Sequence, residues 1–410
     1  MRTSTLATGL AVGIVTMLGL SACDDAALVP PEEPEAGAIF QRYVALGASI
    51  TAGFESGGIN DSTQAHSWPA LLADAMGTEF NQPLLAAPGC PPPFTNILEG
   101  TRVGGGDGES CGLRAQPIPT DLHNLAVPGA EVGDMLDNLG PDSEANALTQ
   151  LILGGRTQVE AAADADPTFL SVFAGGNDIL IVARSGDPAS ATPIQEFTSD
   201  YETLASEVAA LNPEGVVLVG VPDIFAVDLA TGRVPFPFLS LGAAYAAAEG
   251  QPGWPATFDV ADNCAPEAEF PDGEPGEASL VPFSYGFGEL FAAAEQGQAV
   301  QLDCLNDSEV LTTTEWGQAS ATVAAYNGVI QQVADAQDWA YADLTPVLTA
   351  LRDQGVVPPF PDLDAAPDIF GPMFSQDGIH VALPGQTELA AGVAEAIDDT
   401  YGTTVAGDGS

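Results

Sequence analysis

The stretch Tyr43-Val44-Ala45-Leu46-Gly47-Ala48-Ser49 decides the fold. Its first four residues are apolar, as in a buried strand, and Gly47-Ala48 forms a tight turn that leads into a helix. Ser49 stands at the expected start of that helix, where backbone amides face an incoming anion. Because serine is also a common helix cap, this position alone does not establish a catalytic role.

Strand-like and helix-like segments alternate outward from this stretch. Residues 216–221 are almost wholly apolar, which is typical of a strand covered on both faces. Further strands are expected at 125–127, 169–174 and 339–344, and helices at 68–76, 132–139, 195–211, 319–334 and 385–397. This alternation predicts an α/β fold with a parallel sheet between helices, and a site at the carboxyl ends of its strands.

Two stretches do not fit this alternation and are expected to be loop insertions. Residues 84–120 are rich in proline and glycine, and residues 230–312 mix an apolar run with acidic loops. Insertions at this edge of a sheet tend to shape a pocket. Phe236, Phe238 and Leu239 are therefore candidates for a lid or an acyl-binding surface, with ordinary packing as the alternative.

Four short motifs supply the groups that acyl transfer needs. They are GAS ending at Ser49, NLAVPGA around Gly129, GGND around Asn177, and DGIH from Asp377 to His380. The three polar groups of a catalytic triad would be a Ser49 nucleophile, a His380 base and an Asp377 that orients the base. The backbone amides of Ser49 and Gly129 and the side-chain amide of Asn177 would form an oxyanion hole. Each motif is weak alone, since Gly129 also suits a turn and Asn177 a strand-end cap.

Together these motifs resemble the SGNH hydrolases, also called the GDSL esterase/lipase family. The resemblance spans about residues 41–398 and implies a three-layer αβα sandwich with a five-stranded parallel sheet, of the flavodoxin-like type. It also implies a serine esterase or lipase that needs no metal or cofactor and forms an acyl-enzyme on Ser49. The usual Gly-Asp-Ser-Leu block is Gly-Ala-Ser-Ile here, so Ala48 replaces an aspartate.

The resemblance leaves the substrate open among acyl lipids, short-chain esters and O-acetyl groups on polysaccharides. A carbohydrate O-acetyl esterase and a non-catalytic binding lipoprotein remain alternatives. Four further polar residues are interpreted as structural: Asp178 and Asn124 beside the motifs, and His66 and His123, which have no partner at a telling spacing.

The N-terminus predicts export and lipid attachment. An apolar run from Leu6 to Leu20 is too short to span a membrane and is typical of a signal peptide over residues 1–22. Leu20-Ser21-Ala22-Cys23 resembles a bacterial lipobox, which implies a lipid on Cys23 and an anchor in a membrane of the cell envelope. An ordinary secretory signal is the alternative. Residues 23–40 are expected to be an acidic, proline-rich tether, and 399–410 a flexible tail.

The remaining cysteines are Cys90, Cys111, Cys264 and Cys304. An even number in an exported chain suggests two disulfides. Of the three possible pairings, the local one joins Cys90 to Cys111 and Cys264 to Cys304. Metal binding is disfavoured, because no C-x-x-C pair is present and the histidines lie far from the cysteines in sequence.

The chain is strongly acidic. It carries eight basic residues, all arginine, against 57 acidic ones, for a formal charge of −49. Nucleic acids and anionic membrane surfaces are therefore unsuitable partners by long-range electrostatics. Because self-repulsion is relieved by screening ions, we expect a halophilic protein. Apolar residues make up 46% of the chain, which is enough for a large core. We expect the protein to be a monomer that acts on a small-molecule or lipid ester.

Overall fold

The computed structural model describes residues 37–105, 108, 111, 114–137, 146–265 and 276–406. The expected signal peptide, Cys23 and most of the tether lie outside the described residues. Phe40, at the end of the expected tether, is already buried in the core. The expected tail begins as the end of a helix, which runs to Tyr401. No helix in the described part of the chain is long and apolar enough to cross a membrane.

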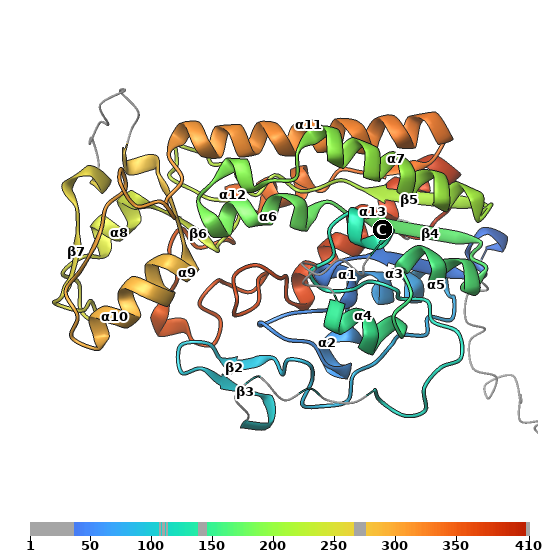
Figure 1. Cartoon of the computed structure of the whole chain (residues 1–410), viewed down its shortest axis with the longest axis horizontal. Coiled ribbons are helices and arrows are strands. Elements are labelled where there is room, and N and C mark those ends of the chain that lie inside the picture. The colour runs from blue at the N-terminus through green and yellow to red at the C-terminus, as the bar shows by residue number, and fades with distance from the viewer. Residues whose placement is uncertain are drawn as a thin grey trace, which may run out of the picture. The chain divides into compact units, whose positions relative to one another are not determined.

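A parallel sheet forms the centre of the fold (Figure 1). Its strands are β1 (Tyr43–Gly47), β4 (Phe169–Phe173), β5 (Gly215–Val219) and β10 (Ala340–Ala342), in the order β1-β4-β5-β10. All neighbouring pairs are parallel, and every residue of β1, β4 and β5 is buried. The alternation predicted from the sequence is therefore confirmed.

The described part of the chain forms a sheet of four strands, so the five strands expected from the resemblance are wrong as a count there. The segment expected to form the fifth strand, at 125–127, does lie beside β1. The backbone N–H groups of Leu125 and Val127 donate to the carbonyls of Ala45 and Gly47, but only one bridge, between Ala45 and Asn124, has strand geometry. The chain turns at Pro128-Gly129 before a longer ladder can form.

Alternate residues of each strand face two separate apolar cores, as the two-residue period of a strand requires. Val44 and Leu46 of β1 point to the larger core, which is shared with α6, α7 and α11. Tyr43 and Ala45 point to the other core, which is shared with α3 and α13. Both faces of the sheet are thus covered by helices, which gives the three layers predicted from the sequence.

The covering helices close to the sheet are α3 (Trp68–Met76), α5 (Gln158–Ala165), α6 (Gly176–Ser185), α7 (Ile194–Ala210), α11 (Thr313–Gln337) and α13 (Leu383–Tyr401). Further helices are α1 (Ser49–Ala52), α2 (Asp61–Gln64), α4 (Asn146–Leu153) and α12 (Thr345–Asp353). Helix α11 packs along α7 on one side of the sheet, and α13 packs against α3 on the other (Figure 1). The helix expected at 132–139 is wrong: only a 3-10 turn forms at Gly133–Met135, and residues 138–139 lie outside the described part.

The first insertion, at 84–120, contains a short hairpin of β2 (Phe94–Asn96) and β3 (Thr101–Arg102). Cys90 and Cys111 form a disulfide, so of the three pairings left open by the sequence the local one is present. Two backbone hydrogen bonds join Ile59 to Cys90 and Pro91. The insertion is therefore attached to the loop that follows α1.

The second insertion, at 230–312, has an apolar core of its own. Its elements are β6 (Leu239–Leu241), α8 (Gly242–Ala248), β7 (Phe258–Val260), β8 (Leu280–Pro282), α9 (Phe283–Tyr285), a π-helix at Gly286–Phe291, α10 (Ala292–Glu295) and β9 (Val300–Leu302). They lie at the left of Figure 1, beyond the ends of α11 and α12. Antiparallel pairing of β6 with β8 and parallel pairing of β7 with β9 hold this unit together.

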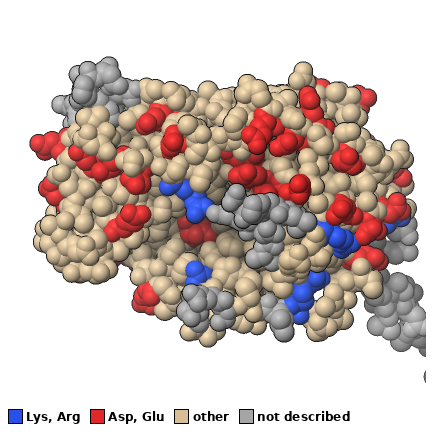
Figure 2. Space-filling view, in the orientation of Figure 1, with Lys and Arg blue, Asp and Glu red and all other residues tan. Residues whose placement is uncertain are grey.

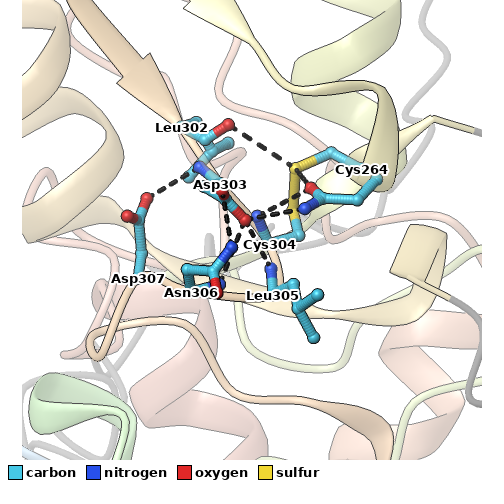
Figure 3. Close-up of a disulfide and its surroundings, with 8 residues drawn as sticks. Cys264, Leu302, Asp303, Cys304, Leu305, Asn306 and Asp307 are labelled. Atoms are coloured by element: carbon cyan, nitrogen blue, oxygen red, sulfur yellow. Dashed lines mark hydrogen bonds between the residues drawn. A yellow bond between two sulfur atoms is a disulfide. The ribbon is translucent and has the colours of Figure 1, made fainter. Parts of the chain in front are cut away.

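The second disulfide, Cys264–Cys304, joins the segments that follow β7 and β9 (Figure 3). Asp303 fixes the turn around it, because its carboxylate accepts hydrogen bonds from the side chain of Asn263 and from the backbone and side chain of Asn306. The backbone N–H of Cys304 donates to Asn263 Oδ1 at 3.1 Å. The disulfide therefore closes a turn that hydrogen bonds already hold.

Candidate active site

Ser49 is the first residue of α1, directly after the carboxyl end of β1. The turn between them has no room for a larger residue at Gly47, since a Cβ atom there would lie 2.4 Å from Thr51 Oγ1. The side-chain amide of the buried Gln158 holds Gly47 from the other side. Its Nε2 donates to the Gly47 carbonyl and its Oε1 accepts from the Gly47 N–H, each at 2.9 Å. The backbone that presents Ser49 is therefore fixed on both sides.

Asp377 and His380 form the hydrogen-bonded pair predicted from their spacing. The imidazole Nδ1 lies 2.8 Å from Asp377 Oδ2, and their side chains are 11% and 12% exposed. An Nδ1–H donated to the carboxylate leaves Nε2 free to accept a proton. The hydrogen bond to Asp377 fixes the position of the His380 ring through Nδ1, as the orienting carboxylate of a triad would.

Asp377 accepts more hydrogen bonds than the one from the His380 ring. Gly57 N–H donates to Oδ2 at 2.7 Å, and the backbone N–H groups of Ile379 and His380 each donate to Oδ1 at 2.9 Å. The Ser375 hydroxyl donates to Oδ1 at 3.1 Å. Burial by itself would raise the pKa of Asp377, but the charge of His380 and these hydrogen bonds lower it to about 2. Asp377 is therefore ionised at any pH at which His380 acts as a base.

Two contacts tie the loop of His380 to the helix of Ser49. The ring of Phe54 lies 4.8 Å from the imidazole ring of His380, between centroids, and the Phe54 N–H donates to the Ser49 carbonyl. In α13, which follows His380, the Gln386 amide donates to the Ile50 carbonyl at 3.4 Å. The two ends of the proposed triad, more than 300 residues apart in sequence, are thereby brought to the same edge of the sheet.

Asn177 lies at the start of α6, directly after β4, and lines the same cavity as Ser49. Its Nδ2 donates to the Ala130 carbonyl at 2.8 Å, and an amide nitrogen has a second hydrogen to donate. Gly129 precedes Ala130 and has φ +88°, a conformation that favours glycine. The structure thus brings the Asn177 amide and the Gly129 turn together, as an oxyanion hole requires.

Two further residues hold this turn in place, and both were interpreted as structural from the sequence. The buried Asn124 donates to the Thr51 carbonyl at 2.8 Å and accepts from the Ala126 N–H, which joins α1 to the segment before Gly129. Asp178 Oδ2 accepts from the Val132 N–H at 3.2 Å, on the other side of the turn. Burial, with the charge of Glu131 next, raises the pKa of Asp178 to about 7.

Sequence reasoning missed the residues that hold the catalytic loop. Gln376 donates to the Phe94 carbonyl and accepts from the Ile97 N–H, each at 2.9 Å, so it clamps the β2–β3 hairpin. Ser56 N–H donates to Ser375 Oγ at 2.7 Å, across about 320 residues of sequence. No short spacing marks these partners, because they lie on separate loops that only folding brings together.

Arg102 extends this network on the hairpin. Its guanidinium donates to the Gly57 carbonyl at 2.9 Å and lies 3.5 Å above the centre of the Phe94 ring. Since the N–H of Gly57 bonds Asp377, Arg102 fixes the loop that supports the catalytic carboxylate.

The two other histidines have partners away from this site. His66 Nε2 lies 3.2 Å from a Glu55 carboxylate oxygen. His123 Nδ1 accepts from the Asn81 N–H at 3.0 Å, and burial lowers the pKa of its imidazole. Within the described ranges, no group of three or more histidine, cysteine, aspartate or glutamate side chains is arranged to hold a metal ion.

A small apolar cavity of about 80 Å³ lies beside Ser49 and Asn177. Its walls include Ile179 and Leu180 of α6, Val221 and Ile224 after β5, Phe236 of the second insertion, and Ile379 next to His380. Phe236 and Phe238 are 4% and 5% exposed, and Leu239 is 1% exposed. Of the three residues considered for a lid, Phe236 lines this cavity and Phe238 lines a second cavity. Both are packed, buried side chains.

Comparison with known proteins identifies the class. Residues 43–237 match the model of the family described as GDSL-like Lipase/Acylhydrolase. This part of the chain holds Ser49, Gly129 and Asn177, while Asp377 and His380 lie beyond it. Over these residues the chain is similar to GDSL-like lipases and acylhydrolases, and the protein is a carboxylic ester hydrolase.

Several solved structures are similar in fold. The acetylxylan esterase Axe2 from Geobacillus stearothermophilus is 12% identical, with a TM-score of 0.38 over 92% of this chain and 100% of that one. An extracellular lipase from Streptomyces rimosus and a phospholipase A1 from Streptomyces albidoflavus are each 13% identical. Their TM-scores are 0.36, over 87% of this chain and 98% of each of theirs. No curated protein matches the chain.

The clamp formed by Gln376 gives a first prediction. Gln376→Ala removes both hydrogen bonds to the hairpin, so the loop that carries Asp377 loses its fixed position. We expect kcat for a small ester to fall about tenfold or more, with KM little changed, because misplaced catalytic groups slow the chemical step. Thr95→Ala in the same hairpin is the matched control, since Thr95 bonds only Thr101 among the described hydrogen bonds. A lower melting temperature with unchanged kcat would contradict a positioning role.

The raised pKa of Asp178 gives a second prediction. The carboxyl group is protonated in the folded chain up to about pH 7, whereas in the unfolded chain it ionises near pH 4. Its contribution to stability is therefore complete below about pH 4 and lost as the pH rises to about 7. Relative to the wild type, Asp178→Asn should gain about 2–3 kcal/mol in free energy of unfolding between pH 5 and pH 8. Denaturant unfolding of both proteins at pH 5 and pH 8 measures this difference. An equal change in the free energy of unfolding of the two proteins between these pH values would contradict the prediction.

Proposed function

We propose that the protein hydrolyses neutral carboxylic esters through an acyl-enzyme on Ser49, and that it does so in the bacterial cell envelope, held by a lipid on Cys23. One observation supports the catalytic part of this proposal. Ser49 and Asn177 line one cavity, and the hydrogen-bonded Asp377–His380 pair lies at the same edge of the sheet. A nucleophile, an oriented base and amide donors are the groups that ester hydrolysis requires.

The proposed reaction has two halves. In the first, Ser49 Oγ attacks the ester carbonyl carbon while His380 Nε2 takes the hydroxyl proton, and Asp377 stabilises the imidazolium. The amides of Ser49, Gly129 and Asn177 hold the negative oxygen of the tetrahedral intermediate. The bond to the alcohol breaks, and His380 gives that alcohol its proton. In the second half, His380 takes a proton from water, the resulting nucleophile attacks the acyl-enzyme, and Ser49 regains its hydrogen as the acid leaves.

The replacement of the family's aspartate by Ala48 leaves this chemistry in place. Ala48 precedes α1 and makes no side-chain cap, while its carbonyl accepts from the Ala52 N–H. Gln158, Thr51 and Asn124 already fix the backbone around the turn. The position of Ser49 therefore does not depend on a side chain at residue 48.

The charge of the protein supports neutral substrates and a saline environment. Acidic side chains are scattered over the face drawn in Figure 2, and basic ones are few. At a formal charge of −49, anionic esters are repelled at low ionic strength, and the chain repels itself. Molar salt should raise both the melting temperature and the turnover.

Ester hydrolysis gives the third prediction. p-Nitrophenyl esters from acetate to palmitate should be hydrolysed by the wild type, faster in molar than in low salt. Ser49→Ala should lower kcat on the order of 10⁴-fold or more, because the nucleophile is lost. The matched control is Ser62→Ala, at an exposed serine of α2. Equal turnover in Ser49→Ala and the wild type would contradict the proposed nucleophile, and equal behaviour at both salt levels would contradict salt adaptation.

The cell-envelope location gives the fourth prediction. It is supported by the apolar run before Leu20-Ser21-Ala22-Cys23 and by the two disulfides, which persist in oxidising compartments. The intact mass of the mature protein should show a chain that begins at Cys23 and carries acyl groups. Cys23→Ser should yield a protein without lipid. A mature wild type with unmodified Cys23 would contradict the anchor.

A further inference from the structure

The cavity that Ser49 and Asn177 line adjoins a second apolar cavity, which lies against α12 and α13. Each has a volume of about 80 Å³. The residues that line both cavities are Ile50, Phe173, Pro222, Ile224, Phe236 and Ile379. Of these, Ile50, Ile224 and Ile379 are only partly buried, as expected of side chains that face an open space. One apolar space therefore begins at Ser49 and extends past these side chains toward α12 and α13.

Helix α12 supplies one wall of the second cavity. Val347, Leu348 and Leu351 line it, and their spacing of three and four residues places them on one face of the helix. No residue of α12 is fully buried, so the core covers this apolar face only in part. A hydrocarbon ligand that covered the face would remove it from water, which is favourable.

The other walls of the second cavity are also apolar. Leu389 comes from α13, and Phe374 and Val381 pair with each other on the two sides of the loop that carries Asp377 and His380. Among the described residues that line this cavity, the only charged or polar side chain belongs to Glu388. Because Glu388 is exposed, its carboxylate stays in water when the cavity is filled.

This lining matches one kind of ligand group. The hydroxyl groups of a sugar would lose their hydrogen bonds to water against apolar side chains, which costs free energy. A hydrocarbon chain makes no such demand and gains from burial. The second cavity is therefore suited to a chain of methylene groups.

The chemistry of acyl transfer indicates which part of an ester carries that chain. The acyl group stays bonded to Ser49 until water releases it, so it must begin in the cavity that Ser49 lines. The alcohol leaves earlier, with the proton of His380. His380 is not among the described residues that line either cavity. The acyl group, and not the alcohol, therefore has the two cavities before it.

We propose that the two adjoining cavities bind the hydrocarbon chain of the acyl group, and that the enzyme prefers esters of medium-chain or long-chain acids to acetates. This inference rests on the proposed function and adds the substrate class. It assigns to the apolar face of α12 the role of a wall against which the far part of the chain packs.

The test compares two isomeric esters, ethyl octanoate and octyl acetate. They contain the same atoms and both release a primary alcohol, so they differ chiefly in the side of the ester bond that carries the long chain. We expect kcat/KM for ethyl octanoate to exceed that for octyl acetate at least about tenfold, from burial of the methylene groups of the acyl chain. Titration of the released acid, below the solubility limit of both esters, measures the two rates.

Variants of α12 test the assignment of the wall. Leu351→Trp and Val347→Trp should each fill the second cavity and lower the ratio of ethyl octanoate to octyl acetate turnover several-fold or more. Ala350→Trp is the matched control, because it adds the same side chain at an exposed position of the same helix, and it should leave the ratio unchanged. Circular dichroism of each variant checks that it is folded.

The outcomes distinguish this inference from the proposed function. Ser49-dependent turnover in which octyl acetate equals or exceeds ethyl octanoate would overturn the inference and leave the esterase standing. A preference for the octanoate that folded Leu351→Trp and Val347→Trp both retain would overturn the role of α12. Absence of Ser49-dependent turnover on every ester would overturn both the inference and the proposed function. A preference for the octanoate that these two variants reduce and Ala350→Trp retains would support the inference.

Discussion

The carboxylate of Asp377 is the interaction on which the site depends. It is nearly buried, yet ionised, because five hydrogen bonds from four residues surround it. One bond orients His380, three come from Ser375, Ile379 and the His380 backbone within the same loop, and one binds the loop after α1 through Gly57. The charge thus joins the segment that carries the base to the segment that follows the nucleophile. A buried charge without these partners would cost several kcal/mol, so loss of the network would affect both catalysis and folding.

Both insertions contribute residues near this carboxylate. The first sends the β2–β3 hairpin to Gln376, whose amide bonds the hairpin backbone twice, and to Gly57 through Arg102. The second contributes Phe283, Phe287 and Phe291 to a cavity that Asp377 also lines. The sheet and its helices therefore present the groups of the proposed triad, while the first insertion fixes the loop that carries Asp377.

Much of this could be predicted from the sequence because the signals are local. Apolar strands such as β5 and the helix α3 are marked by runs of consecutive residues, and the Asp377–His380 pair lies within four residues. The fifth strand could not be excluded, since the turn at Gly129 ends the pairing of 125–127 with β1 after one bridge. The clamp at Gln376 depends on contacts across about 280 residues, which no spacing in the sequence reveals.

The central claim is that Ser49 is a nucleophile activated by the His380–Asp377 pair. Reaction with a fluorophosphonate, followed by peptide mass spectrometry, tests it directly, because an activated serine reacts much faster than an ordinary one. The account predicts one adduct per chain, located on Ser49, and a much slower reaction in Asp377→Asn, in which the imidazole loses its orienting charge. An adduct on another serine, or equal labelling rates in the wild type and Asp377→Asn, would contradict it.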